Sequence, residues 1–252
     1  MAELATDTRR RPLRVGHKGA AAVVPGNTLA SFDAALALGV DMIELDVLST
    51  RPDGGGELLI AHDYEALRSH PPLSLAEALE HLASPPFAGI QIDLDVKLPG
   101  YELRVVEQLR TAGLTDRTLL SGMYPSALAR VRAAEPSLRL GWSVPRVRRD
   151  YTSDLLTAIP ALAALTGYRA ALPRRARATL ASGAVDAIMA HWRVVTPALL
   201  RAVRSHGGEL YVWTVDDAAR IASLTALGVD GIITNDPRLF AGDRDGSAEG
   251  FS

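Results

Sequence analysis

The stretch Met42-Ile43-Glu44-Leu45-Asp46-Val47 decides the fold of this sequence, because apolar and acidic residues alternate along it. Side chains of a strand point alternately to its two faces, so Glu44 and Asp46 share one face and the apolar residues share the other. Two carboxylates on a buried face repel each other and need a cation beside them. The stretch therefore predicts a strand with one packing face and one face suited to chemistry.

Strand-like runs alternate with helical patterns on both sides of this stretch. We expect eight strands, at Leu13–His17, Asp41–Leu48, Ile90–Lys97, Arg117–Ser121, Leu138–Ser143, Asp186–His191, Glu209–Thr214 and Gly231–Asn235. Helical patterns lie between them, for example at Thr28–Leu38, Tyr101–Ala112, Pro125–Ala134, Pro197–Ser205 and Asp217–Leu227. Eight such units in 252 residues predict an α/β protein, a closed (β/α)8 TIM barrel. A doubly wound open sheet is disfavoured, because no glycine-rich phosphate loop follows the first strand.

One segment interrupts the alternation after the second strand. The run Leu58–Ala61 is strand-like but follows only the short turn Asp53-Gly54-Gly55-Gly56. A parallel crossover needs a dozen or more residues, so we expect a β-hairpin excursion here. A turn centred near Asp53-Gly54 pairs Asp46 with Ala61 or His62, which carries His62 back to the carboxylates.

Helix ends and a long stretch complete the expected organisation. Asn27 and Ser74 resemble helix N-caps, and Glu77 completes a capping box with Ser74. The stretch Val144–Val185 contains three prolines, so we expect broken helices over one barrel end. We expect three basic residues of this stretch to contact a polar or anionic part of the substrate; they are Arg146, Arg148 and Arg149. The alternative is that the stretch forms an ordinary helix layer packed on the outside of the barrel.

Composition narrows the classes of function. The chain has 27 Lys and Arg against 29 Asp and Glu, a net charge of −2 and no cysteine. This excludes disulfides, cysteine zinc sites and thiol nucleophiles, and it argues against a nucleic-acid partner. We expect no membrane insertion, no secretory signal and therefore a cytoplasmic location. The expected organisation is a disordered lead at 1–12, one barrel domain at 13–240 and a disordered tail at 241–252.

The inward face of Ile90–Lys97 adds to the acidic pair. Asp93, Asp95 and Lys97 share that face with Gln91. Carboxylates from two strands suit a hard divalent ion such as Mg²⁺ or Ca²⁺. The alternative is a salt-bridge network around Lys97 that holds no metal.

Histidines and lysines gather at the same barrel mouth. His17 ends the first strand and His62 ends the hairpin, so the two form a candidate acid/base pair. Lys18 and Lys97 are the only lysines of the chain, and both map to this mouth. Cations beside a carboxylate-bound metal suit a phosphate substrate. Trp213, at the end of the seventh strand, is a candidate wall of the site or a packing residue.

The sequence resembles the glycerophosphodiester phosphodiesterases. The matching blocks run through nearly the whole chain: His17-Lys18-Gly19, Asn27-Thr28, Ser31-Phe32, Gly39–Val47, Asp53-Gly54, His62-Asp63, Asp95-Val96-Lys97, Val212–Asp216 and Asp230–Pro237. The resemblance implies a barrel, one divalent metal ion, and hydrolysis of glycerophosphodiesters or a related phosphodiester to an alcohol and glycerol phosphate. By this resemblance, His17 and His62 act as acid and base, and Lys97 neutralises the phosphate. The resemblance also gives the metal ligands as Glu44, Asp46 and Asp95. The further candidates for substrate or phosphate binding are Lys18, Asn27 and Trp213.

The chain departs from the family pattern at several positions. Lys18 stands where the family usually has Arg, and Gly26 stands where it has Glu. The third metal carboxylate of the family is usually Glu, and here it is Asp95. The segment that usually follows the second His-Asp block is short here. We therefore keep two other functions open, which are a catalytically dead barrel that binds a phosphorylated ligand and a metal-dependent lyase or aldolase. The expected partner is a small phosphodiester, and the sequence leaves the oligomeric state open.

Overall fold

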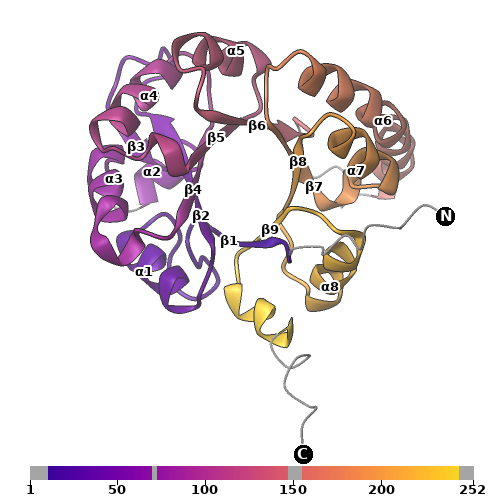
Figure 1. Cartoon of the computed structure of the whole chain (residues 1–252), viewed down its shortest axis with the longest axis horizontal. Coiled ribbons are helices and arrows are strands. Elements are labelled where there is room, and N and C mark those ends of the chain that lie inside the picture. The colour runs from indigo at the N-terminus through magenta and orange to yellow at the C-terminus, as the bar shows by residue number, and fades with distance from the viewer. Residues whose placement is uncertain (1–10, 70–72, 147–154, 244–252) are drawn as a thin grey trace, which may run out of the picture.

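A computed structural model of the chain describes residues 11–69, 73–146 and 155–243. The strands lie in a central ring with the helices outside it (Figure 1). The strands are β1 Leu13–His17, β2 Met42–Ser49, β3 Leu58–Ile60, β4 Gln91–Val96, β5 Thr118–Gly122, β6 Arg139–Val144, β7 Ala187–His191, β8 Glu209–Trp213 and β9 Gly231–Thr234. The α-helices of the described residues are α1 Leu29–Ala37, α2 Ala66–Ser69, α3 Leu75–Ala83, α4 Glu102–Thr111, α5 Pro125–Ala134, α6 Leu155–Ala181, α7 Pro197–Arg204 and α8 Ala218–Leu227.

The sheet closes on itself. Its strand order is β1-β9-β8-β7-β6-β5-β4-β2-β3, and β1 also pairs with β2. Every pairing in the ring is parallel, whereas β3 pairs antiparallel with the outer end of β2. Eight parallel strands thus form the predicted (β/α)8 barrel, with the predicted hairpin after its second strand. A closed ring leaves no edge at which a doubly wound sheet would end, so that alternative is excluded.

The hairpin has the predicted register. Val47 pairs with Ile60, and the backbone N–H of Ala61 donates to the carbonyl of Asp46 at 3.1 Å. The tip of the hairpin contacts α4, because Arg104 Nη1 donates to the carbonyl of Gly54 at 2.6 Å. This contact holds the tip of the hairpin in place. The second strand of the hairpin, β3, then returns the chain to the barrel mouth.

Two separate hydrophobic clusters hold the barrel together. The larger one lies between the sheet and the helices, and the smaller one fills the interior with Val15, Met42, Leu119, Ala187, Met189, Tyr211 and Ile233. On β1 and β2 the polar residues follow the inner apolar residues by two positions along the same face, as His17 follows Val15. The interior therefore has an apolar middle layer and is polar toward the carboxyl ends of the strands. At the amino ends of the strands, Arg139 of β6 bonds Gln91 of β4 and Glu209 of β8 across the interior.

Helix caps differ in one place from the sequence prediction. The capping box of Ser74 and Glu77 is present. At α1 the prediction of Asn27 as N-cap is wrong, because Thr28 Oγ1 accepts from the backbone N–H of Ser31. Asn27 has a φ of 61° and its amide donates instead to Asp46 Oδ2 at 2.9 Å. Asn27 therefore binds the buried carboxylate of Asp46 instead of capping α1.

The stretch between β6 and β7 also differs from the prediction. It forms one helix, α6, over Leu155–Ala181, rather than broken helices. Each internal proline removes one backbone hydrogen bond, while Leu172, Ala176 and Leu180 bury one face of this helix against the outer core. Arg146 lies with its guanidinium carbon 4.3 Å from the ring centre of Tyr124. Arg148 and Arg149 lie outside the described residues.

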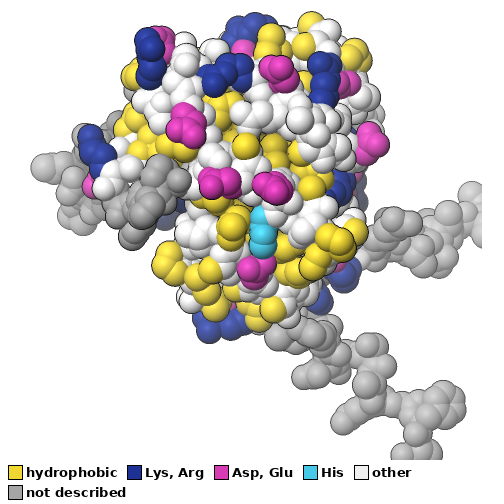
Figure 2. Space-filling model, turned by 90° about the vertical axis from the view of Figure 1, so that its left-hand side faces the viewer, with side chains coloured by type: hydrophobic (Ala, Val, Ile, Leu, Met, Phe, Trp, Pro, Cys, Tyr) yellow, Lys and Arg dark blue, Asp and Glu magenta, His cyan; other side chains and the backbone are white. Residues whose placement is uncertain are grey.

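The outer surface carries mixed charges on the side that Figure 2 presents. Basic, acidic and hydrophobic side chains are interspersed there. Among the described residues, none of the helices is long and apolar enough to cross a membrane. The other predictions for the termini concern residues 1–12 and 241–252, most of which lie outside the described residues.

Candidate active site

Strand register brings the predicted residues into one place. His17 of β1 pairs with Glu44 of β2, and on the other side of β2 Asp46 pairs with Asp95 of β4. Side chains at paired positions of parallel strands point to the same face of the sheet. Because this face is the barrel interior, four polar side chains from three neighbouring strands meet at the mouth.

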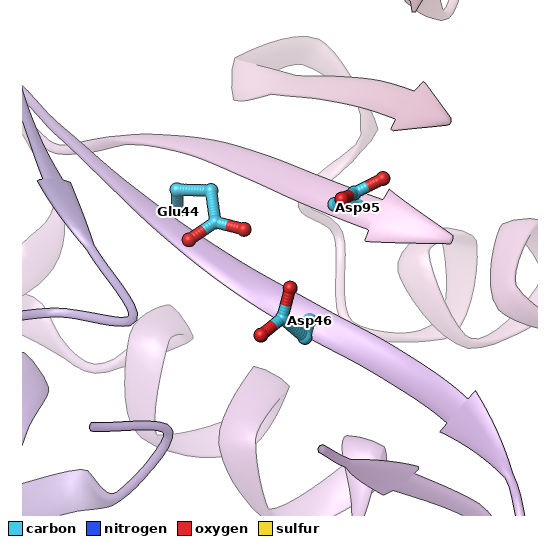
Figure 3. A group of neighbouring side chains, drawn as sticks. All are labelled: Glu44, Asp46 and Asp95. Atoms are coloured by element: carbon cyan, nitrogen blue, oxygen red, sulfur yellow. The ribbon is translucent and has the colours of Figure 1, made fainter. Parts of the chain in front are cut away.

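Three carboxylates form the centre of this arrangement. Glu44 and Asp46 extend from β2 and Asp95 extends from the adjacent β4 (Figure 3). One oxygen from each residue lies within 4.8 Å of one oxygen from each of the others. Asp46 is fully buried and Glu44 is 4% exposed. Such convergence of buried carboxylates is unfavourable without positive charge.

Both lysines of the chain contact this group. Lys97 Nζ lies 2.5 Å from Asp95 Oδ2 and also forms an ion pair with Asp46 Oδ1. Lys18 Nζ lies 3.5 Å from Asp46 Oδ2. Burial alone would raise the pKa of Asp46, but these two ammonium groups outweigh it and lower that pKa. Burial opposes a charge on Lys97, but the surrounding carboxylates raise the pKa of Lys97 well above its usual value.

The lysines do not balance the whole acidic group. Burial, followed by the charge of Asp46, raises the pKa of Glu44 well above its ordinary value. Asp93, one layer deeper on β4, is 1% exposed, and burial raises its pKa to about 7. Asp95 Oδ1 is buried without a hydrogen-bond partner. An all-oxygen donor set with an unpaired carboxylate oxygen fits a hard divalent cation.

The two histidines have different surroundings. His17 Nε2 lies 3.7 Å from Glu44 Oε2, and His17 Nδ1 lies 2.6 Å from Asn235 Oδ1. Burial is the main cause that lowers the pKa of His17 to about 4, so this imidazole is neutral at pH 7. His62 is half exposed, and its Nδ1 lies 3.0 Å from Asp63 Oδ2. The hairpin brings His62 to the pocket that His17 lines.

The substrate-side candidates lie around the same carboxylates. The Asn27 amide contacts Asp46, and the backbone N–H of Lys18 donates to Glu44 Oε2 at 2.9 Å. A Cβ on Gly26 would come within 2.8 Å of the Cβ of Lys18. Since the Cβ of Ala21 would lie as close, at 2.9 Å, a larger residue at position 26 would require this loop to shift.

One pocket collects most of these side chains. Trp213 is part of its wall, and its Nε1 donates to the carbonyl of Met189 at 2.9 Å. The lining residues are His17, Glu44, His62, Asp93, Asp95, Lys97, Ser121, Met123, Ser143, Met189, Trp213, Thr214 and Ile233. Asp93 was predicted on the inward face, and Ser121 at a strand end was a candidate donor to the substrate. Ser143 and the two methionines of this lining were not predicted. The signal for Ser143 in the sequence is a small polar residue between Trp142 and Val144.

Comparison with known proteins identifies the family. Residues 17–71 and 88–239 match the Glycerophosphoryl diester phosphodiesterase family. These two ranges span most of the chain and contain all of the predicted site residues. The chain belongs to this family, and it is an enzyme that cleaves phosphoric diesters.

Individual relatives agree with this assignment. A glycerophosphodiester phosphodiesterase of Bacillus altitudinis is 29% identical over 255 residues, covering 88% of this chain and 93% of that protein. One from Caldanaerobacter subterraneus is 25% identical over 259 residues, covering 90% and 95%. A glycerophosphodiester phosphodiesterase structure from Parabacteroides distasonis shares the fold with a TM-score of 0.71, at 15% identity over 94% of this chain and all of that one. A phosphodiesterase structure from Oleispira antarctica, in complex with the product sn-glycerol-3-phosphate, has a TM-score of 0.68 at 18% identity, covering 93% and 97%.

Proposed function

We propose that this enzyme hydrolyses glycerophosphodiesters to an alcohol and glycerol phosphate at the barrel mouth. The observation that carries the proposal is the meeting of three carboxylates, two lysines and two histidines at one end of the barrel. The names of the relatives support the substrate class, and so does the product held by the Oleispira antarctica enzyme.

We propose Glu44, Asp46 and Asp95 as the ligands of one divalent metal ion, either Mg²⁺ or Ca²⁺. A bound ion would polarise the phosphoryl group and neutralise charge as it develops there. The unpaired Asp95 Oδ1 and the oxygen-only donor set support this assignment. In this reading Lys97 balances Asp46 and Asp95 before the ion arrives and neutralises the phosphate afterwards.

We propose that the histidines move the protons of the reaction. His17 is neutral at pH 7, so its Nε2 takes the proton of the attacking hydroxyl. That hydroxyl belongs to water, which gives glycerol phosphate directly, or to the glycerol of the substrate itself. In the second case a cyclic phosphodiester forms as the alcohol leaves, and water then opens it to glycerol phosphate. His62, beside the carboxylate of Asp63, gives a proton to the leaving alkoxide. The positions of the two rings at the rim of one pocket support this division.

The remaining candidates orient the substrate. We propose that Lys18 and Lys97 attract the phosphate, that Asn27 holds the neighbouring loop on Asp46, and that Trp213 walls the pocket. We further propose that residues 13–240 form a single catalytic domain. The cytoplasmic location stays a prediction.

One assay tests the proposed substrate class and its metal dependence. Purified protein is incubated with bis(p-nitrophenyl) phosphate and with several glycerophosphodiesters, each with Mg²⁺, with Ca²⁺ and with EDTA. The proposed function requires metal-dependent turnover of at least one glycerophosphodiester. Turnover of bis(p-nitrophenyl) phosphate alone would contradict the substrate class, and equal turnover in EDTA would contradict the metal dependence.

A further inference from the structure

The two ring nitrogens of His17 contact different groups. Nε2 faces Glu44 and the pocket, whereas Nδ1 is 2.6 Å from the amide oxygen of Asn235. An amide oxygen accepts hydrogen bonds and does not donate them. The contact at Nδ1 therefore requires a hydrogen on that nitrogen, which leaves the lone pair of the neutral ring on Nε2.

The orientation of the Asn235 amide is itself determined. Asn235 Nδ2 donates to Asp216 Oδ2 at 2.6 Å, and the backbone N–H of Asn235 donates to Asp216 Oδ1 at 2.8 Å. A carboxylate accepts only, so the amide nitrogen must face Asp216 and the amide oxygen must face His17. Thr234 Oγ1 donates to Asp216 Oδ1 at 2.9 Å and holds the carboxylate from a third direction.

Neighbouring strand ends position this unit. Asp216 follows β8, Asn235 follows β9 and His17 ends β1, and these three strands are adjacent in the ring. Neither Asn235 nor Asp216 lines the pocket. Their connection to the pocket runs through the ring of His17, which Asn235 contacts directly.

We propose that Asn235 and Asp216 are positioning residues that hold His17 with its hydrogen on Nδ1 and its Nε2 lone pair directed at the reacting hydroxyl. The inference rests on the proposed role of His17 and adds residues that the role requires. Partners that fix the tautomer and ring orientation of a functional histidine commonly change activity by about 10- to 100-fold when they are removed.

Three variants separate positioning from simple structural support. Asn235→Ala removes the acceptor at Nδ1 and should lower kcat by about 10- to 100-fold, with KM changed by less than about twofold because substrate contacts remain. The Asp216→Asn/Asn235→Asp double variant exchanges the two side chains, so every hydrogen bond keeps a donor and an acceptor. It should recover most of the lost kcat.

Asp236→Asn is the matched control. Asp236 lies on the same turn but bonds Arg238 rather than His17. This variant should keep kcat and KM at the values of the original chain. All variants are compared for thermal unfolding, so that a loss of folded protein is not counted as a loss of kcat.

A second readout does not depend on activity. Long-range ¹H–¹⁵N spectra of metal-free protein report which ring nitrogen carries the hydrogen, and the His17 signals are assigned by their loss in His17→Ala. The proposal requires the Nδ1–H form of His17 in the original chain and a mixture of both forms in Asn235→Ala. An Nε2–H form in the original chain, or an unchanged tautomer together with unchanged kcat in Asn235→Ala, would overturn it.

A wrong substrate assignment and a wrong positioning role would give different experimental results. If the original chain turns over no glycerophosphodiester while His17 still changes tautomer in Asn235→Ala, the positioning stands and the substrate assignment is wrong. If the original chain is active and both Asn235 readouts stay unchanged, the substrate assignment stands and the positioning is wrong.

Discussion

Lys97 Nζ lies 2.5 Å from Asp95 Oδ2, and this ammonium also reaches Asp46, which pairs with Asp95 across β2 and β4. The lysine therefore forms ion pairs with two of the three carboxylates that we propose as metal ligands. A metal site and a metal-free salt-bridge network share this geometry, and substitution of Lys97 distinguishes them.

The first prediction concerns Lys97→Met. Loss of the ammonium leaves the buried carboxylate of Asp46 poorly balanced, and breaking a buried pair costs about 3–5 kcal/mol of unfolding free energy. Metal-free Lys97→Met should therefore unfold at a lower temperature than the original chain. Since a bound cation replaces the missing charge, Mg²⁺ or Ca²⁺ should raise its Tm more than that of the original chain.

The change in Tm of Lys97→Met is compared with that of Lys18→Met. The ammonium of Lys18 forms an ion pair only with Asp46 among the three carboxylates, at 3.5 Å, so its loss should lower the metal-free Tm less. The measurement is thermal unfolding with EDTA and with each metal. If neither metal changes the Tm of any of the three proteins, the salt-bridge network replaces the metal site as the explanation.

The second prediction concerns the docking of the hairpin that carries His62. Gly54 has a φ of 79°, and a Cβ there would come within 2.8 Å of the carbonyl oxygen of Gly100. Gly54→Ala should therefore displace the hairpin tip and lower kcat, while metal binding at Glu44 and Asp46 is retained. Steady-state kinetics and calorimetry of metal binding measure the two effects.

Gly39→Ala is the control for backbone strain. Gly39 has a φ of 74°, but a Cβ there would meet no atom within 4 Å. Both substitutions place alanine at a positive φ, which costs roughly 1–2 kcal/mol. Equal losses of kcat in the two variants would show that strain, rather than hairpin displacement, causes the effect.

The third prediction concerns the histidines. His17→Ala and His62→Ala should each lower kcat by about 100-fold or more, the scale of a lost general acid or base. The double variant should be little slower than the slower single variant, because residues that act as a unit are not additive. The assay is turnover under saturating substrate. Turnover near that of the original chain in either single variant would remove that histidine from the mechanism.

The fourth prediction concerns the pH dependence of stability. Glu102 is 2% exposed, accepts from the backbone N–H of Gly100 at 2.6 Å and pairs with Arg130. Burial opposes ionisation, but these donors outweigh it and lower the pKa of Glu102 below its ordinary value of 4.5. A lowered folded-state pKa stabilises the protein above that ordinary value, and the contribution is lost as pH falls through the folded-state pKa.

Glu102→Gln should therefore lower the free energy of unfolding by about 1–3 kcal/mol at pH 7, and by progressively less below about pH 4.5. Urea unfolding at several pH values measures this difference. Glu107→Gln, on the exposed face of the same helix, should change little at any pH. A Glu102→Gln difference that stays constant with pH would contradict the assigned pKa shift.

Much of the barrel was predictable because its strands carry local signals. Alternation of apolar and polar residues located the strands, and the turn at Asp53-Gly54 was enough to set the pairing of Val47 with Ile60. Convergence of Glu44, Asp46 and Asp95 follows from that alternation once the sheet is closed. The strands and the hairpin could be predicted because residue alternation and turn residues are signals contained within short segments of the sequence.

The features that were not predicted depend on tertiary contacts. The choice of Thr28 rather than Asn27 as cap follows from the bond between Asn27 and Asp46. His17 and Asn235 are 218 residues apart, so no local pattern indicates their hydrogen bond. The helix α6 continues through Pro173, where Leu172, Ala176 and Leu180 bury one face of it against the core.

The central claim is metal-dependent hydrolysis of a glycerophosphodiester at the carboxylate site. The most direct test follows sn-glycero-3-phosphocholine by ³¹P NMR, with the original chain and with Glu44→Gln, each in Mg²⁺, Ca²⁺ or EDTA. The account predicts that glycerol phosphate accumulates only with the original chain and metal. Equal accumulation in EDTA or with Glu44→Gln, or release of phosphocholine instead of glycerol phosphate, would contradict it.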